Sequence, residues 1–205
     1  MTGADGVMGL LALVGLYAIF LFWYGGRTRP VSAAEVETVL DLMRRQGVDH
    51  DDPELYASLQ RLLAQDDGRE FLMLNLIHYR DKAAYPPGMN FGDSAEAADR
   101  RYARAFFPWL LRYGNVPVFI ARRSGSFIEP ANLDYWQVVA MIRYRSRRDF
   151  IRSVTAVVGK DVMVHKWAAI ETTHVFPVRP LFSFIAVRLV AATPLAIVAL
   201  IAWNL

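Results

Sequence analysis

The chain has 205 residues, 54% of them hydrophobic, and a formal net charge of +3. This length suffices for one ordinary domain with membrane segments, so a second domain is not expected. Basic and acidic residues are interspersed instead of forming a basic block, which argues against a nucleic-acid partner. The absence of cysteine excludes disulfides, thiolate catalysis, cysteine-ligated zinc and iron–sulfur clusters.

Residues 7–24 form an apolar segment without a charged side chain, and they are long enough to cross the hydrocarbon core of a bilayer. The six residues before it contain Asp5 but no basic residue, and no small-residue cleavage site follows. We therefore expect residues 1–6 to be an outer tail and residues 7–24 to be a retained transmembrane helix instead of a cleaved signal peptide.

Residues 181–203 form a second apolar segment, interrupted by Ser183, Arg188 and Thr193. Arg188 lies about 10 Å into this segment at the rise of a helix. Its long side chain can therefore extend back to the headgroups. Pro194 is expected to kink the helix. The sequence thus predicts one transmembrane helix at each end of the chain.

The flanking charges predict the orientation of these two helices. Arg27 and Arg29 follow the first segment and Arg179 precedes the second, whereas the outer tails contain no lysine or arginine. The positive-inside rule then places the central domain in the cytoplasm and both termini outside. We expect a multi-pass protein of a bacterial inner (cytoplasmic) membrane, with the lipid bilayer as a partner.

Residues 30–68 are predicted to be a helical lead-in. Apolar residues recur at helical spacing over residues 33–46 until Gly47 ends the pattern. Asp52 and Pro53 form a favourable cap and first-turn pair for a second helix that ends near Gly68.

Residues 69–178 are predicted to form the main domain. The nearly continuous apolar run at 71–79 is typical of a buried strand. One helix is expected to begin after Asp93 or Ser94 and to end near Tyr113. The sequence S-x-x-D from Ser146 opens another helix, expected to continue through residue 158. The remaining predicted elements are strands at 116–123, 135–144 and 169–176 and a helical turn at 162–167.

The predicted order is strand, helix, strand, strand, helix, strand, which is the ferredoxin-like split β-α-β arrangement of an α+β fold. Its helices cover one face of the sheet. The other apolar face requires a cover that one chain does not supply, so the sequence predicts a homodimer.

Several stretches resemble the dimeric α+β barrel domains of the small bacterial family known as domain of unknown function thirteen-thirty. They are LMLNLIHYRDKA, the helix containing Asp99 to Tyr102, DYWQVVAMIRYRSRRDFIRSV and HKWAAIETTHVF. The resemblance covers residues 71–177 and is most specific in R-Y-x-S-R-x-x-F, from Arg143 to Phe150. It implies a face-to-face dimer whose two sheets form a barrel, but no activity. Related barrels include cofactor-free monooxygenases, haem-handling enzymes and isomerases. The two membrane segments and the leading helices depart from the usual family pattern.

Four histidines, His50, His78, His165 and His174, are too scattered for a zinc motif, so neither a metal nor a cofactor is predicted. Antiparallel pairing of the last predicted strand with the first would place His174 opposite about Leu74 and roughly 13 Å from His78. As pocket candidates, His78, His165 and His174 are suited to proton transfer near neutral pH. The alternative for each is a hydrogen-bonded structural role.

Asn75 interrupts an apolar strand, where its amide must find hydrogen-bond partners. It either points with Tyr79 into the pocket of the barrel or bonds to nearby backbone. Tyr102 and Arg143 are further pocket candidates for an anionic or aromatic ligand, and solvated surface is the alternative.

Two groups of side chains are candidates for contacts with a membrane or with another protein. A basic cluster suits either anionic headgroups or a charged helix start, and it consists of Arg143, Arg145, Arg147, Arg148 and Arg152. An apolar group on the first helix of the domain suits either the core or a partner-binding face, and it consists of Phe106, Phe107, Trp109 and Leu110.

The sequence leaves two function hypotheses open and does not decide whether the protein is an enzyme. The first is a membrane-tethered binding or accessory subunit that docks on other membrane proteins. The second is a cofactor-free enzyme, monooxygenase- or isomerase-like, that acts on a lipophilic molecule such as a quinone, an isoprenoid or an aromatic compound.

Overall fold

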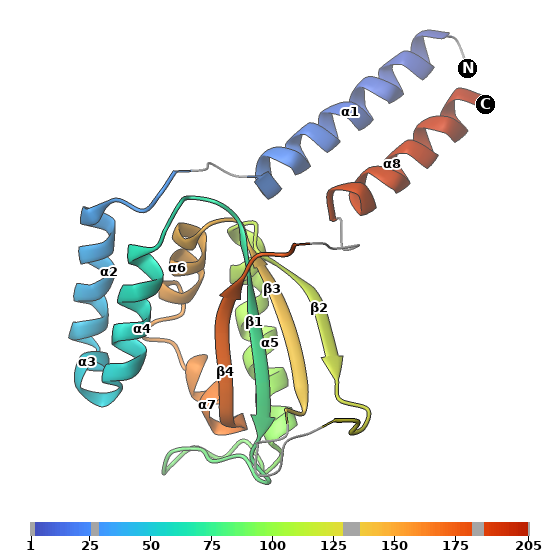
Figure 1. Cartoon of the computed structure of the whole chain (residues 1–205). Coiled ribbons are helices and arrows are strands. Elements are labelled where there is room, and N and C mark those ends of the chain that lie inside the picture. Colours follow the sequence, from blue (N-terminus) through green and yellow to red (C-terminus); the bar gives the residue numbers. More distant parts are fainter. Residues whose placement is uncertain (1–2, 26–28, 129–135, 182–186, 205) are drawn as a thin grey trace. The chain divides into compact units, whose positions relative to one another are not determined.

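The computed structural model describes residues 3–25, 29–128, 136–181 and 187–204. It has a mixed α+β architecture, and its internal contacts divide the chain into two compact units (Figure 1). One unit contains Met1–Gly26 and Pro180–Leu205, and the other contains Arg27–Arg179.

The first unit consists of the two terminal helices, α1 (Gly3–Gly25) and α8 (Val187–Asn204). The Tyr17 hydroxyl donates a hydrogen bond of 3.1 Å to the carbonyl oxygen of Arg188. The Arg188 guanidinium lies 5.2 Å from the centre of the Tyr24 ring. Within α1, residues Gly6–Gly25 are long and apolar enough to cross a membrane, and their side chains are largely exposed.

The predicted second span is not fully described. Residues 182–186 lie outside the described part of the chain, and the apolar part of α8 is Val187–Ile201. A helix of this length extends about 22 Å, which is shorter than the ~30 Å hydrocarbon core. The structure therefore supports one helix of spanning length, at the N-terminal end.

The lead-in of the second unit contains the two predicted helices, α2 (Ala33–Arg45) and α4 (Pro53–Ala64). Ser32 and Glu35 form a reciprocal capping box at the start of α2. The Asp52 carboxylate accepts a hydrogen bond from the backbone N–H of Leu55 and thereby caps α4. A short helix between them, α3 (Val48–Asp51), was not predicted.

Four strands form one sheet of order β2-β3-β1-β4, in which every neighbouring pair is antiparallel. The strands are β1 (Phe71–Tyr79), β2 (Val116–Arg122), β3 (Val138–Tyr144) and β4 (Ile170–Val178). All four predicted strands are present.

The predicted register of the last strand was wrong by two residues. His174 pairs with Leu76, not with Leu74, and lies closer to His78 than the expected 13 Å. An irregularity between His78 and Tyr79 shifts the pairing there. A local strand pattern does not fix this register, because it depends on how the chain enters β4 from the preceding helix.

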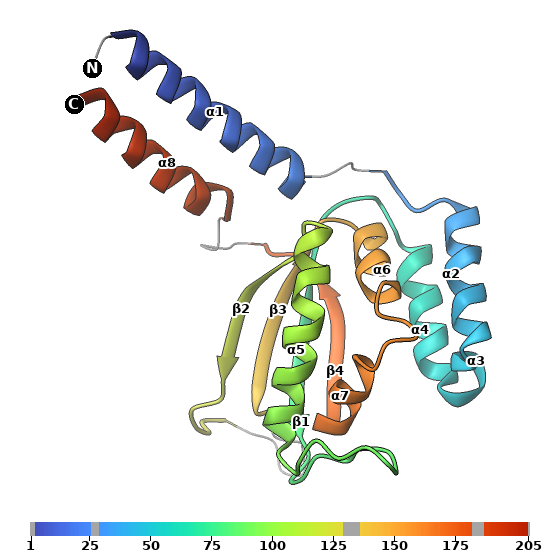
Figure 2. The same cartoon turned by 180° about the vertical axis from the view of Figure 1, so that it is seen from behind.

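Three helices pack on one face of the sheet (Figures 1 and 2): α5 (Ala95–Arg112), α6 (Arg147–Thr155) and α7 (Met163–Ala169). Ser94 caps α5 and Ser146 caps α6, as the sequence predicted. However, α6 ends at Thr155, not at Val158. Beyond it the chain turns and brings Val157 into the core. Within the described part of this unit, no helix covers the other face of the sheet.

Two clusters of buried side chains hold α5 against the sheet. The larger cluster contains Phe71 and Met73 of β1, Phe106 and Leu110 of α5, and Tyr144 of β3. The smaller cluster consists mainly of small side chains, and it contains Ala98, Ala168, Ala169 and Ile170. The two clusters contact different parts of α5, one near each end.

A buried amide connects the start of β2 to the start of α6. Asn115 is fully buried, and its side-chain NH₂ donates to the carbonyl oxygen of Asp149 over 3.1 Å. Its side-chain oxygen accepts from the backbone N–H of Arg145 over 3.0 Å. These two bonds satisfy backbone groups that water does not reach.

Replacing Asn115 with alanine should lower the free energy of unfolding by about 2 kcal/mol or more, because both backbone partners would be left unpaired in the interior. Thermal or denaturant unfolding of the detergent-solubilised chain measures this loss. Asn90→Ala, at an exposed loop position, is the matched control and should have little effect. Equal stability of the two variants would show that the buried amide is not needed.

Candidate functional site

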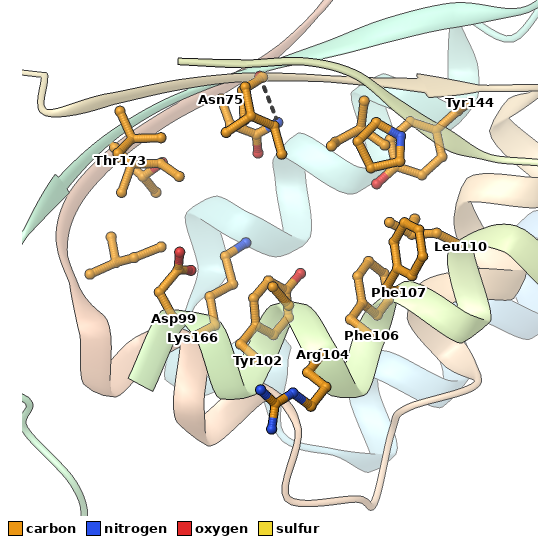
Figure 3. A pocket seen from close by; sticks show the side chains of 18 of the residues that line it. Asn75, Asp99, Tyr102, Arg104, Phe106, Phe107, Leu110, Tyr144, Lys166 and Thr173 are labelled. Carbon is orange, nitrogen blue, oxygen red and sulfur yellow. Dashed lines mark hydrogen bonds between the residues drawn. The ribbon is translucent and has the colours of Figure 1, made fainter. Parts of the chain in front are cut away.

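A cavity of about 470 Å³ lies between α5 and the face of the sheet that α5 covers. Its walls come from all four strands, from α5 and from α7, and most of them are apolar. Seven side chains with polar groups also line it, and Figure 3 labels them: Asn75, Asp99, Tyr102, Arg104, Tyr144, Lys166 and Thr173. Arg104 is at the edge, and its guanidinium points away from the cavity (Figure 3).

The cavity exists because the middle of the sheet offers small side chains to α5. Ala140 of β3 pairs with Asn75 of β1, and both line the cavity. Neither side chain is long enough to fill the space between the two core clusters. Pro108 of α5 also lines the cavity, and a proline interrupts the hydrogen-bond ladder of its helix.

Lys166 of α7 extends its amine into the cavity from the helix side, between Asp99 and Tyr102 in the view of Figure 3. Its Nζ lies 5.7 Å from the centre of the Tyr102 ring and 4.8 Å from that of Trp167. Within the described residues, this amine has neither a hydrogen-bond acceptor nor an ion pair. The surrounding protein lowers the pKa of Lys166 by removing water from the charged form, and the Asp99 carboxylate opposes this change.

Asp99 is the carboxylate of the site. Its Oδ2 accepts a hydrogen bond of 2.6 Å from the hydroxyl of Tyr79. Burial raises the pKa of the Tyr79 hydroxyl, and this bond to Asp99 raises it further. Burial also raises the pKa of Tyr102, with a smaller contribution from the charge of Asp99. Both tyrosines are therefore protonated near neutral pH and act as hydrogen-bond donors.

Asn75 and Tyr102, both predicted from the sequence, line this cavity. Asn75 donates from its NH₂ group to the carbonyl oxygens of Met73, at 3.0 Å, and Ala140, at 3.4 Å. The amide is therefore bound by backbone, as the second of its two alternatives proposed, and the side chain also lines the cavity beneath α5. Asn75 and Tyr79 face α5, not the uncovered sheet face that would line a dimeric barrel.

The other four pocket candidates lie elsewhere. His78 points to the opposite sheet face, where its Nε2 lies 3.5 Å from Glu171. His174 is on that face too and packs on the Trp136 ring. His165 contacts the rings of Tyr85 and Phe91 outside the cavity. Among the described residues, no group of histidines and carboxylates is arranged to hold a metal ion.

Arg143, the last pocket candidate, is buried at the end of β3. Its guanidinium bonds to the Glu70 carboxylate and donates to the carbonyl oxygen of Gly114 over 3.0 Å. The domain uses this side chain to join the starts of β1 and β2.

The predicted basic cluster is distributed over internal ion pairs. Arg145 and Arg152 pair with Asp149, and Arg148 pairs with Glu35. The pairing with Arg148 lowers the pKa of Glu35 to about 2. Arg143 and Arg147 are buried, which removes them from contact with headgroups, so the structure favours the alternative in which these arginines support a helix start.

Sequence reasoning missed Lys166, Thr173 and the role of Asp99. The available signal for Lys166 was one lysine inside the apolar helical turn VHKWAA. Phe106 and Leu110 are buried in the core, as one of the two alternatives for the aromatic group proposed. Phe107 is exposed for 44% of its surface and lines the cavity.

The chain is similar in structure to RPA0582, a protein of unknown function from Rhodopseudomonas palustris. In one crystal structure, the match is 26% identical, covers 63% of this chain and 94% of that chain, and has a TM-score of 0.53. A crystal structure of methylated RPA0582 protein matches at 23% identity over 78% of this chain and 98% of that chain, with a TM-score of 0.54.

These similarities support the α+β sheet fold but supply no activity. No protein-family model matches the chain, and no curated protein matches it. The resemblance to the domain of unknown function thirteen-thirty stays a prediction.

Replacing Lys166 with methionine should raise the free energy of unfolding at pH 7 by about 1 kcal/mol or more, because it removes a cation to which the described residues offer no hydrogen bond or ion pair in an apolar cavity. The pKa of Lys166 in the folded chain lies below its ordinary value of 10.5. At pH values between these two pKa values, the unfolded chain therefore binds more protons than the folded chain. The stability contributed by this site therefore rises with pH toward 10.5 in the wild type.

Unfolding temperatures at pH 7 and pH 9 in detergent measure both effects. The Lys166→Met variant should be more stable than wild type at pH 7, with a smaller gain at pH 9. Lys82→Met, at an exposed position, is the control and should change neither. A less stable Lys166→Met variant would contradict the expected cost of placing the amine in the cavity.

Proposed function

We propose that the central domain binds a lipophilic small molecule in the cavity between α5 and the sheet and acts on it without a cofactor. The observation that carries this proposal is an apolar cavity of about 470 Å³ with a few polar groups facing it. Binding sites for small molecules usually have volumes of about 300–1,000 Å³ and this composition. The substrate classes that fit are quinones, isoprenoids and aromatic compounds.

The polar groups suit a ligand with an oxygen at one end. Tyr102 and Lys166 offer hydrogen-bond donors to a ligand from the helix side of the cavity, while Asn75 and Thr173 lie on the sheet side (Figure 3). Donors enclosed by apolar walls discriminate strongly in favour of a ligand that can pair with them, because otherwise they remain unpaired. The apolar walls then bind the rest of the molecule through burial.

We further propose that the domain is a ferredoxin-like dimeric α+β barrel in which two copies cover each other's open sheet faces. The strand order and the uncovered face support this arrangement. Large apolar side chains alternate onto that face from all four strands, including Leu74, Phe119, Met141 and Phe176. Phe119 and Phe176 are exposed for 41% and 42% of their surfaces, and a second copy would bury them.

Both terminal helices are proposed to span a bacterial inner membrane, with the central domain in the cytoplasm and both termini outside. The apolar surface of α1 and the arginines next to the apolar segments support this topology. A membrane anchor suits the proposed ligand, because lipophilic molecules concentrate in the bilayer.

Filling the cavity should abolish ligand binding. Thr173→Phe adds a ring on the cavity face of β4, whereas Thr172→Phe adds the same ring on the opposite face. Lipid-soluble molecules that co-purify with the full-length protein, extracted and measured by mass spectrometry, should be lost from Thr173→Phe and retained by Thr172→Phe. Equal retention in two folded variants would mean that the ligand is not held in this cavity.

A binding or accessory subunit of a membrane complex is the second candidate function. It is favoured by the exposed apolar side chains of α1, such as Met8, Ile19 and Phe22. In a bilayer, such a helix can pack against the helices of other membrane proteins.

Membrane attachment and partners can be tested together. The protein should stay with vesicles after an alkaline carbonate wash, because apolar helices that cross the bilayer are not released by removing charge interactions. Affinity purification in mild detergent at native expression should return a homodimer, with other membrane proteins if the accessory role holds. Release by carbonate would contradict the proposed membrane anchors. A monomer would contradict the proposed barrel dimer, and a homodimer without other proteins would count against the accessory role.

A further inference from the structure

We propose that the ligand of the cavity is a lipophilic aldehyde or ketone and that Lys166 condenses with its carbonyl carbon. This inference rests on the proposed function, because it names the chemical class of the ligand and the residue that reacts with it. The geometry points to it through one amine, one carboxylate and two hydroxyl groups that face the same apolar cavity.

The Lys166 amine is placed as a nucleophile requires. Its Nζ faces the cavity, and within the described residues no carboxylate lies within the 4.0 Å that defines an ion pair. Its near neighbours are the rings of Tyr102 and Trp167. An amine enclosed by apolar groups favours the uncharged form, and that form carries the electron pair that attacks a carbonyl carbon.

The hydroxyl groups of Tyr102 and Tyr144 are suited to hold the carbonyl oxygen. Both residues line the cavity, and within the described part of the chain neither hydroxyl has a hydrogen-bond partner. Both are protonated near neutral pH, since burial raises the pKa of each hydroxyl. A donor at the carbonyl oxygen withdraws electrons from the carbonyl carbon and stabilises the alkoxide that forms when the amine attacks.

The Asp99 carboxylate favours a carbonyl ligand over an anionic ligand. Its carboxylate lines the same cavity, so a carboxylate or phenolate ligand paired with Lys166 would face a second negative charge. A carbonyl compound is neutral when it enters. Its condensation product is a cation, which Asp99 stabilises as a counter-ion. A carbonyl ligand therefore interacts favourably with both Lys166 and Asp99.

The reaction balances without an oxidant or a reductant. The uncharged Lys166 nitrogen forms a bond to the carbonyl carbon as the second carbon–oxygen bond breaks, and one proton moves from the nitrogen to the oxygen, which gives a neutral carbinolamine. The hydroxyl group then leaves with one proton taken from the solvent, which releases one water molecule and leaves a carbon–nitrogen double bond. The resulting iminium nitrogen carries one proton and one positive charge, and hydrolysis reverses the sequence.

The composition of the chain provides internal references for a labelling experiment. Its three lysines are Lys82, Lys160 and Lys166, and the first two are exposed. Full-length protein in detergent is incubated at pH 7 with decanal and sodium cyanoborohydride, which reduces the iminium to a stable secondary amine. Peptide mapping by mass spectrometry then measures the rate of decyl addition at each lysine.

We expect Lys166 to react at least about tenfold faster than Lys82 and Lys160, because the cavity concentrates the aldehyde next to the amine. Decanol has the same chain without a carbonyl, so it should slow the reaction at Lys166 alone. Equal rates at the three lysines, or no protection by decanol, would overturn the proposal.

Binding and adduct formation are measured separately, which separates this inference from the proposed function. Lys166→Arg keeps the positive charge but does not form the stable imine, so this variant should give no adduct at position 166. Binding of decanal and decanol by the wild type without an adduct at Lys166 would overturn the condensation and leave the lipophilic cavity standing. Failure of the wild type to bind either compound would remove both proposals.

Discussion

The site depends on how α5 is held against the sheet at two separate places. Large side chains close the gap near the end of the helix, where Phe106 and Leu110 meet Phe71 and Tyr144. Small side chains close it near the start, around Ala98. Between these clusters the helix is fixed at a distance that the side chains of the central strands do not span. The cavity is therefore a consequence of the distribution of side-chain sizes along α5, and its shape is as rigid as the two clusters that bound it.

The elements of the second unit could be predicted because each has a local signal. The apolar run of β1 gave its bounds, and Ser94 and Ser146 gave the starts of α5 and α6. The register of β4 could not be predicted, because no residue within the strand fixes it. The short helix at Val48–Asp51 was also missed, since four residues carry no periodic pattern. Local chemistry thus predicted the elements, while their alignment came from tertiary contacts.

The candidate site was predicted in part, at Asn75 and Tyr102. Asn75 was noticed because it is polar within an apolar strand, and it lines the cavity. Arg143 was proposed as a group for an anionic or aromatic ligand, but it is bound by Glu70 and Gly114. A sequence does not distinguish a buried cation that has a partner from one that lacks it. Lys166 was missed because a lysine in a short helix is usually solvated, and only the fold shows that it faces a cavity.

Two buried arginines differ from the partly buried Lys166 in the partners that the chain gives them. Arg143 and Arg147 are buried, and the chain supplies each with a carboxylate and a backbone carbonyl. Such pairing offsets the loss of hydration. Lys166 receives no such partner among the described residues, although Asp99 lines the same cavity and is bound instead by Tyr79. The amine therefore carries a cost that the folded chain does not offset by itself. A ligand that condenses with this amine would leave a positive charge on the nitrogen, facing the Asp99 carboxylate. That interaction would offset the cost of placing Lys166 in the cavity, and it forms only when the ligand is bound.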